Sequence, residues 1–96
     1  MPAITAADAF SLAQERLTQL ARSANEQFEF LVDETREVEQ GWVFFFNSVD
    51  FVRTRNPLYA LAGNGPIFVS LEGKILSLPS TIPWEDSLRQ YLLRRG

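Results

Sequence analysis

The side chains of this sequence that could carry chemistry are mainly its carboxylates. The chain has no cysteine and no histidine, which removes thiolate nucleophiles and the usual general base near neutral pH. A metal site would have to be built from carboxylates, yet Asp33, Glu34 and Glu37 lack the spacing of a calcium-binding loop. Ser48 and Ser80 have no histidine to activate them. We therefore predict a protein that is not an enzyme and that has no metal and no cofactor.

The acids are concentrated in the middle of the chain. Residues 26–50 carry seven acids and one arginine, a net charge of −6, whereas residues 51–96 have a net charge of +3. An acidic segment repels the phosphates of nucleic acid and steers the approach of a basic protein. The same acids could simply be solvated residues that keep a small protein soluble. Both interpretations, a binding surface and a solvated face, stand at this point.

The length and the start of the chain limit where the protein can work. Ninety-six residues suit one domain spanning residues 1–96. No stretch approaches the roughly 18 consecutive apolar residues that indicate a membrane helix. The first ten residues, MPAITAADAF, lack the basic and apolar regions of a signal peptide. We expect a cytoplasmic protein that contacts neither membrane nor nucleic acid.

Apolar spacing predicts one helix near each end. Apolar residues recur every three or four positions over residues 6–24, with Thr5 as the N-cap and Asp8 in the first turn. The second helix is expected to begin beside Pro83. Its apolar stripe consists of Trp84, Leu88, Tyr91 and Leu92. Both stripes are expected to pack against the core of the domain.

The first pair of strands is predicted on either side of a turn at Gly41. Phe28, Phe30 and Val32 alternate with other residues, which predicts a strand with one buried face. Residues 33–36 blur the alternation and predict a bulge or a turn. After that interruption, the strand is expected to resume at residues 37–39 with Glu37 and Glu39 facing outward.

Four aromatic rings follow in the stretch GWVFFFNS, residues 41–48. Trp42, Phe44 and Phe46 fall on one face of a strand, and Phe45 falls on the other with a valine. Apolar residues on both faces indicate a strand that is covered on both sides. We therefore expect these rings to be core residues, with Trp42 or Phe45 as the candidates for an exposed contact patch.

The rest of the chain completes an α+β pattern. Residues 48–62 show no periodicity and are interpreted as a loop, and the Gly-Asn-Gly-Pro turn at 63–66 lacks the lysine of a phosphate-binding loop. Residues 67–71 and 74–78 predict a hairpin in which Gly73 takes a left-handed conformation. The predicted fold is two-layer, with a mainly antiparallel four-stranded sheet packed against an N-terminal and a C-terminal helix.

The same motifs resemble those of a known family. GWVFF, then LAGN with Pro66, Ile67 and Val69, then Gly73, Ile75 and Leu78, resemble the YrhB-domain proteins, which are also called the immunity protein 35 family. Tyr91 stands where that family has a terminal aromatic residue. The resemblance covers about residues 5–92 and rests mostly on structural motifs. Ser80 departs from the pattern, because the family more often has glycine there.

The resemblance implies a role in immunity against bacterial toxins. Members are encoded beside a toxin that is delivered between bacteria, for example by type VI secretion, and they bind and neutralise it. Because the middle of this chain is acidic and the sequence shows no signal peptide, we expect the cognate toxin to have a basic active-site cleft and to act in the cytoplasm, as a nuclease or nucleotide-modifying enzyme would. The residues expected to bind it combine the acids with two rim arginines. They are Glu29, Asp33, Glu34, Glu37, Glu39, Asp50, Arg53 and Arg55.

Two alternatives remain open from the sequence. A holdase-like chaperone or general interaction module would present a wet aromatic patch that includes Trp42 and Phe45. A small-ligand site would lie beneath the predicted loop and be lined by Phe51, Tyr59 and Trp84. Burial of the first two rings favours an acidic interface, and a closed core at the third position removes the ligand site.

Overall fold

The structure is a computed structural model that describes residues 3–61 and 65–95. Ala62, Gly63 and Asn64, which belong to the predicted turn and to the family motif, lie outside the described residues. The elements in chain order are α1 (Ala6–Ala24), β1 (Phe28–Phe30), the 3-10 turn η1 (Val32–Glu34), β2 (Arg36–Val38), β3 (Gly41–Phe44), β4 (Phe46–Ser48), α2 (Val49–Thr54), the 3-10 turn η2 (Pro57–Tyr59), β5 (Ile67–Ser70), β6 (Ile75–Ser77) and α3 (Trp84–Arg95).

Helix α1 has the bounds and the start that its sequence predicts. The hydroxyl of Thr5 accepts a hydrogen bond from the backbone N–H of Asp8 at 3.1 Å, and the Asp8 carboxylate accepts one from the N–H of Thr5 at 3.2 Å. This reciprocal capping box satisfies two backbone donors that the first turn leaves unpaired. Asn25 ends the helix with a φ of 55°, a left-handed conformation that asparagine tolerates well.

The strands form two antiparallel sheets, where the sequence predicts one. Strands β1 and β4 pair with each other, and the larger sheet has the order β2-β3-β5-β6. The predicted strand through the four rings breaks at Phe45, whose carbonyl accepts a hydrogen bond from the N–H of Leu31 at 2.8 Å. The chain thereby passes from β3 in the larger sheet to β4 in the smaller one.

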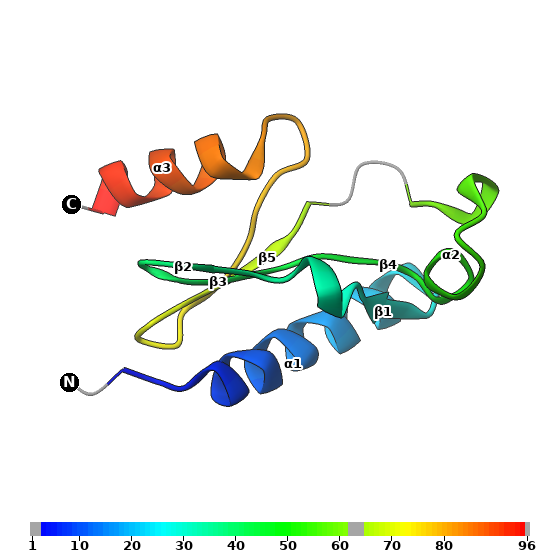
Figure 1. The fold of residues 1–96 in the computed structure, drawn as a ribbon, viewed down its shortest axis with the longest axis horizontal. Coiled ribbons are helices and arrows are strands. Elements are labelled where there is room, and N and C mark those ends of the chain that lie inside the picture. The colour runs from blue at the N-terminus through cyan, green and yellow to red at the C-terminus, as the bar shows by residue number, and fades with distance from the viewer. Residues whose placement is uncertain (1–2, 62–64, 96) are drawn as a thin grey trace.

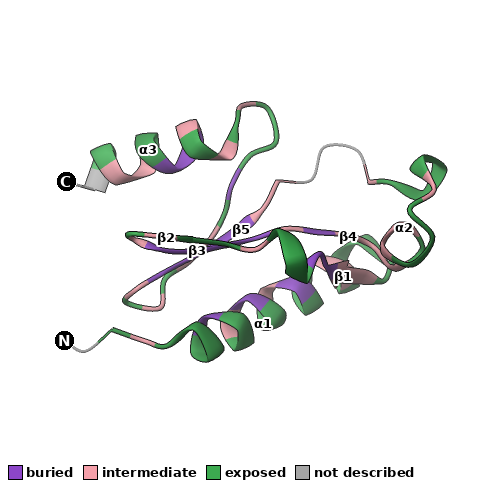
Figure 2. Ribbon diagram, viewed as in Figure 1, coloured by how far each residue is buried: buried purple, intermediate pink, exposed green. Residues whose placement is uncertain are grey.

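The two long helices lie on opposite faces of the larger sheet (Figure 1). Helix α1 packs on Trp42, Phe44 and Val69, whereas α3 packs on the other face, against Val43 and Phe68. The α+β class is confirmed, but the arrangement has three layers and corrects the expected two. The physical reason is that β3 and β5 are buried at every residue (Figure 2), so each face of both strands needs a cover.

The aromatic run is mainly core, as predicted. Trp42 is 8% exposed, and Phe44 and Phe46 are also buried in the cluster beneath α1. Phe45 is half-buried on the opposite face, where its ring meets that of Trp84 edge-on with centroids 6.2 Å apart. Alternation along the strand therefore divides the rings between the apolar cluster beneath α1 and the one beneath α3.

The predicted loop at residues 48–62 is wrong in one respect, because it contains α2 and η2. Ser48 caps α2 by accepting a hydrogen bond from the N–H of Phe51, and Asn56 caps η2 by accepting one from Leu58. Pro57 occupies the first turn of η2, where its missing N–H costs nothing. Elements this short contain too few residues to show an apolar period.

Gly41 is one of the glycines whose small size the fold requires. Its φ is 153°, and a Cβ atom placed there would lie 2.1 Å from the carbonyl oxygen of Val69. Gly73 also has a positive φ, of 89°, but a Cβ there would meet nothing closer than a Leu12 methyl at 3.6 Å. Both glycines have a positive φ, but of these two only Gly41 also has a steric overlap. Comparing substitutions at the two positions therefore isolates the effect of the overlap.

We expect Gly41→Ala to destabilise the protein by about 3 kcal/mol or more, since backbone of β5 has to move. Gly73→Ala should cost about 1–2 kcal/mol, because only the positive φ is unfavourable. Urea unfolding of both variants measures the difference. Equal losses would show that the close approach of Gly41 to Val69 does not limit the fold.

Candidate functional site

The predicted acidic residues lie at the surface, but the structure divides them. Glu29 is on β1, Asp33 and Glu34 are in η1, and Glu37 is on β2. Glu39 is in the β2–β3 turn, and Asp50 is in the first turn of α2. The register pairs Glu37 with Trp42, so Glu37 shares the α1 face of the sheet with that ring.

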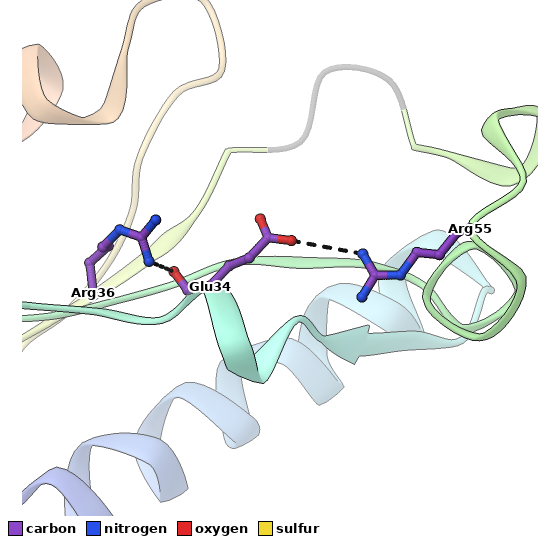
Figure 3. A network of polar contacts seen from close by, with 3 residues as sticks. All are labelled: Glu34, Arg36 and Arg55. Carbon is purple, nitrogen blue, oxygen red and sulfur yellow. Dashed lines mark hydrogen bonds and ion pairs between the residues drawn. The ribbon is translucent and has the colours of Figure 1, made fainter.

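Two of the acids are paired with the two predicted arginines. Arg53 lies 3.9 Å from Glu29, and Arg55 lies 3.8 Å from Glu34 (Figure 3), measured between guanidinium nitrogen and carboxylate oxygen. Arg36 donates a hydrogen bond to the backbone carbonyl of Glu34 at 3.1 Å. The arginines thus face acids of their own chain, and two exposed ion pairs connect the α2 segment with β1 and η1.

Backbone geometry at α2 sets the position of these arginines. Arg55 ends the helix with a φ of 59°, and its N–H donates to the carbonyl of Phe51 at 2.7 Å. Its guanidinium carbon stands 5.8 Å from the centroid of the Phe51 ring, within the range of a cation–π contact. The Ser48 hydroxyl donates to the carbonyl of Tyr59 at 2.6 Å and ties η2 to the start of the helix.

The other four predicted acids are exposed and form no ion pair among the described residues: Asp33, Glu37, Glu39 and Asp50. The first three follow one another along η1, β2 and the β2–β3 turn, which we call the acidic edge. Asp50 stands apart on α2. The acidic edge is therefore the part of the predicted set in which exposed, unpaired carboxylates follow one another closely, with Arg36 between Asp33 and Glu37.

Sequence reasoning missed a groove of about 430 Å³ beside the acidic edge. It lies between the end of β2 and α3, and its lining is Val38, Gln40, Trp84, Glu85, Leu88, Arg89, Leu92 and Leu93. Leu93 is 74% exposed and lies outside the apolar stripe of α3. A leucine on the polar side of a predicted helix was the available signal, but the strand opposite it could not be identified from the sequence.

The residues named by the two alternatives are placed differently from what those alternatives require. Trp42 and Phe45 pack in the two core layers, so they do not form the wet aromatic patch of a general chaperone. Trp84 belongs to the cluster beneath α3, whereas Phe51 is on α2 (Figure 1). These helices lie toward opposite ends of the molecule, so the expected ligand site is not assembled.

The described residues also lack two other kinds of site. Within residues 3–61 and 65–95, no group of three potential metal ligands comes together. No helix in the same ranges is long and apolar enough to cross a membrane.

Comparison with known proteins finds relatives for most of the chain. The family described as Immunity protein 35 matches residues 7–92. "Uncharacterized protein YrhB" from Escherichia coli (strain K12) is 34% identical over 58 residues, which cover 59% of this chain and 62% of that protein. The match thus spans less than two thirds of that relative. No solved structure matches the chain significantly.

The two ion pairs of α2 are expected to contribute little to stability, because all four side chains are substantially exposed. A double-mutant cycle with Glu34→Gln and Arg55→Gln should give a coupling free energy below about 1 kcal/mol. The coupling should fall further as salt is added. A value of several kcal/mol would contradict the view that these acids are held only loosely.

Proposed function

We propose that this chain, which belongs to the immunity protein 35 family, binds a cognate bacterial toxin and neutralises it by covering the toxin's active site. The toxin is a protein with a basic active-site cleft that acts in the cytoplasm, such as a nuclease or a nucleotide-modifying enzyme. Inhibition is stoichiometric, with one immunity protein occupying one toxin. The immunity protein performs no chemistry of its own.

The observation that carries this proposal is the acidic edge, where Asp33, Glu37 and Glu39 are exposed and form no ion pair among the described residues. The negative charge of an unpaired carboxylate is not neutralised by a neighbouring cation. Its electric field therefore accelerates the encounter with a basic surface and orients the partner. Glu29 and Glu34 contribute less, because their arginine partners offset part of their charge. Arg53 and Arg55 limit the surface toward α2.

An acidic inhibitor suits a toxin whose substrate carries phosphate groups. A cleft that binds nucleic acid or nucleotides is lined with lysine and arginine, because these residues neutralise phosphate charge. A row of carboxylates presents the same sign of charge as the substrate. The immunity protein therefore competes for the residues that the toxin uses to bind its substrate.

The first test is binding to the product of the neighbouring gene. Purified wild-type protein should capture that product in a one-to-one complex whose affinity falls as salt rises, because the association is electrostatic. Capture of many heat-unfolded proteins, with no complex at low salt, would instead support a general chaperone.

Charge reversal on the acidic edge should slow association. We expect Glu37→Lys to lower the association rate constant about tenfold at low salt and to weaken its salt dependence. Glu15→Lys changes the net charge identically but lies on the exposed side of α1, so it should have a much smaller effect. Stopped-flow mixing measures both rates. Equal slowing by both variants would mean that net charge, and not the acidic edge, steers the toxin.

A further inference from the structure

We infer that the toxin docks on β2 by adding an extended segment to the open edge of the four-stranded sheet. The inference rests on the proposed function and specifies how the contact is made. Strand β2 is the first in the order β2-β3-β5-β6, so one side of it has no neighbour among the described strands. An exposed strand edge is a template for pairing with another chain.

The hydrogen-bond pattern identifies which backbone groups face outward. The N–H of Leu71 donates to the carbonyl of Gln40 at 3.0 Å, and the register pairs Trp42 with Val69 two residues farther along. In an antiparallel ladder, successive residues direct their backbone groups to opposite sides. On β3, the groups of Gln40 and Trp42 therefore face β5, and those of Gly41 face β2.

The same alternation then applies to β2. Gly41 and Val43 use their backbone groups to bind their partners Val38 and Arg36. Glu37, between those partners, directs its N–H and its carbonyl away from the sheet. The open edge thus offers one donor and one acceptor at Glu37, in the middle of the acidic edge.

The side chains on either side of that edge specify the sequence of the added segment. A residue paired opposite Glu37 would share its face of the sheet and meet its carboxylate, which favours lysine or arginine. The next residue of the segment would lie on the α3 face with Val38, at the 430 Å³ groove that Trp84 and Leu93 also line. An apolar side chain suits that position. The expected segment is therefore an extended strand with a basic residue next to an apolar one.

Charge selects a basic partner over a second copy of this chain. Two β2 strands paired about Glu37 would set Glu37 of one copy against Glu37 of the other, and like charges directly opposite are destabilising. The other edge strand, β6, carries no acid and has Lys74 just before it. Strand β2 is short and charged, which discourages non-specific addition, so the groove and the acids supply the specificity.

Amide hydrogen exchange on the complex with the neighbouring gene's product tests this docking mode directly. The Glu37 amide should exchange rapidly in the isolated protein and at least about tenfold more slowly in the complex, because it gains a backbone acceptor. An unchanged rate at Glu37 in a complex that does form would overturn the docking mode and leave the proposed function intact. Failure of the wild-type protein to bind would overturn both.

Two matched pairs of variants give a second test. Glu37→Gln removes the charge and keeps the N–H, whereas Glu37→Pro removes both; proline is tolerated where a strand N–H faces solvent. The Kd of Glu37→Pro should exceed that of Glu37→Gln by about tenfold. Leu93→Ser should raise Kd about fivefold or more by weakening the groove. Leu58→Ser, at a leucine that is 87% exposed on η2, should leave it unchanged.

Circular dichroism and thermal unfolding establish that each variant is folded before binding is measured. If Glu37→Pro unfolds, the leucine pair and the exchange rate of Glu37 decide the question. Equal Kd values for Leu93→Ser and Leu58→Ser, in a complex that wild-type protein forms, would remove the groove from the interface and overturn the docking mode.

Discussion

Burial of β3 and β5 on both faces is the constraint from which the rest of this structure follows. Every residue of both strands is buried, so the larger sheet requires a cover on each side. Helix α1 supplies one cover and α3 the other (Figure 2). A chain of 96 residues thereby obtains an apolar cluster on each face of one short sheet, and most of its aromatic residues belong to these two clusters.

The break at Phe45 determines where several surface groups lie. Because the chain leaves the larger sheet there, β4 pairs with β1 and carries the chain into α2. The side chains of Asn47 and Ser48 fix the segment after α2 and the start of the helix. The Asn47 side-chain oxygen accepts a hydrogen bond from the N–H of Leu61 at 2.7 Å, and the Ser48 hydroxyl accepts one from the N–H of Phe51 at 3.1 Å. The arginines of α2 then lie beside Glu29 and Glu34, whereas Asp33, Glu37 and Glu39 form no ion pair among the described residues.

The proposed function depends on surface complementarity. The core uses its large apolar side chains for stability, and the proposed recognition uses exposed charge, a strand edge and a groove. The acidic edge, the open side of β2 and the groove beneath α3 lie next to one another. In the proposed complex, exposed charge would speed association, backbone hydrogen bonds would add affinity, and the apolar groove would add specificity.

Local signals in the sequence determined much of the fold. The long apolar period of α1 and its cap at Thr5 predicted the helix at its observed bounds, since caps and periodicity act over three or four residues. Alternation placed Trp42, Phe44 and Phe46 on one buried face. Composition identified the acidic segment, because charge counts need no structure.

Only the tertiary structure decided how these parts are used. The division into two sheets, the opposite positions of α1 and α3, and the groove between Val38 and Leu93 depend on contacts between residues far apart in the chain. Which acids are paired was equally inaccessible, because Glu29 and Arg53 meet only after β1 and β4 have joined. Alternation shows that a strand has two faces, but it does not show which element covers each face or which edge stays open. Those choices are made by non-local packing, where many pairings satisfy the same local pattern.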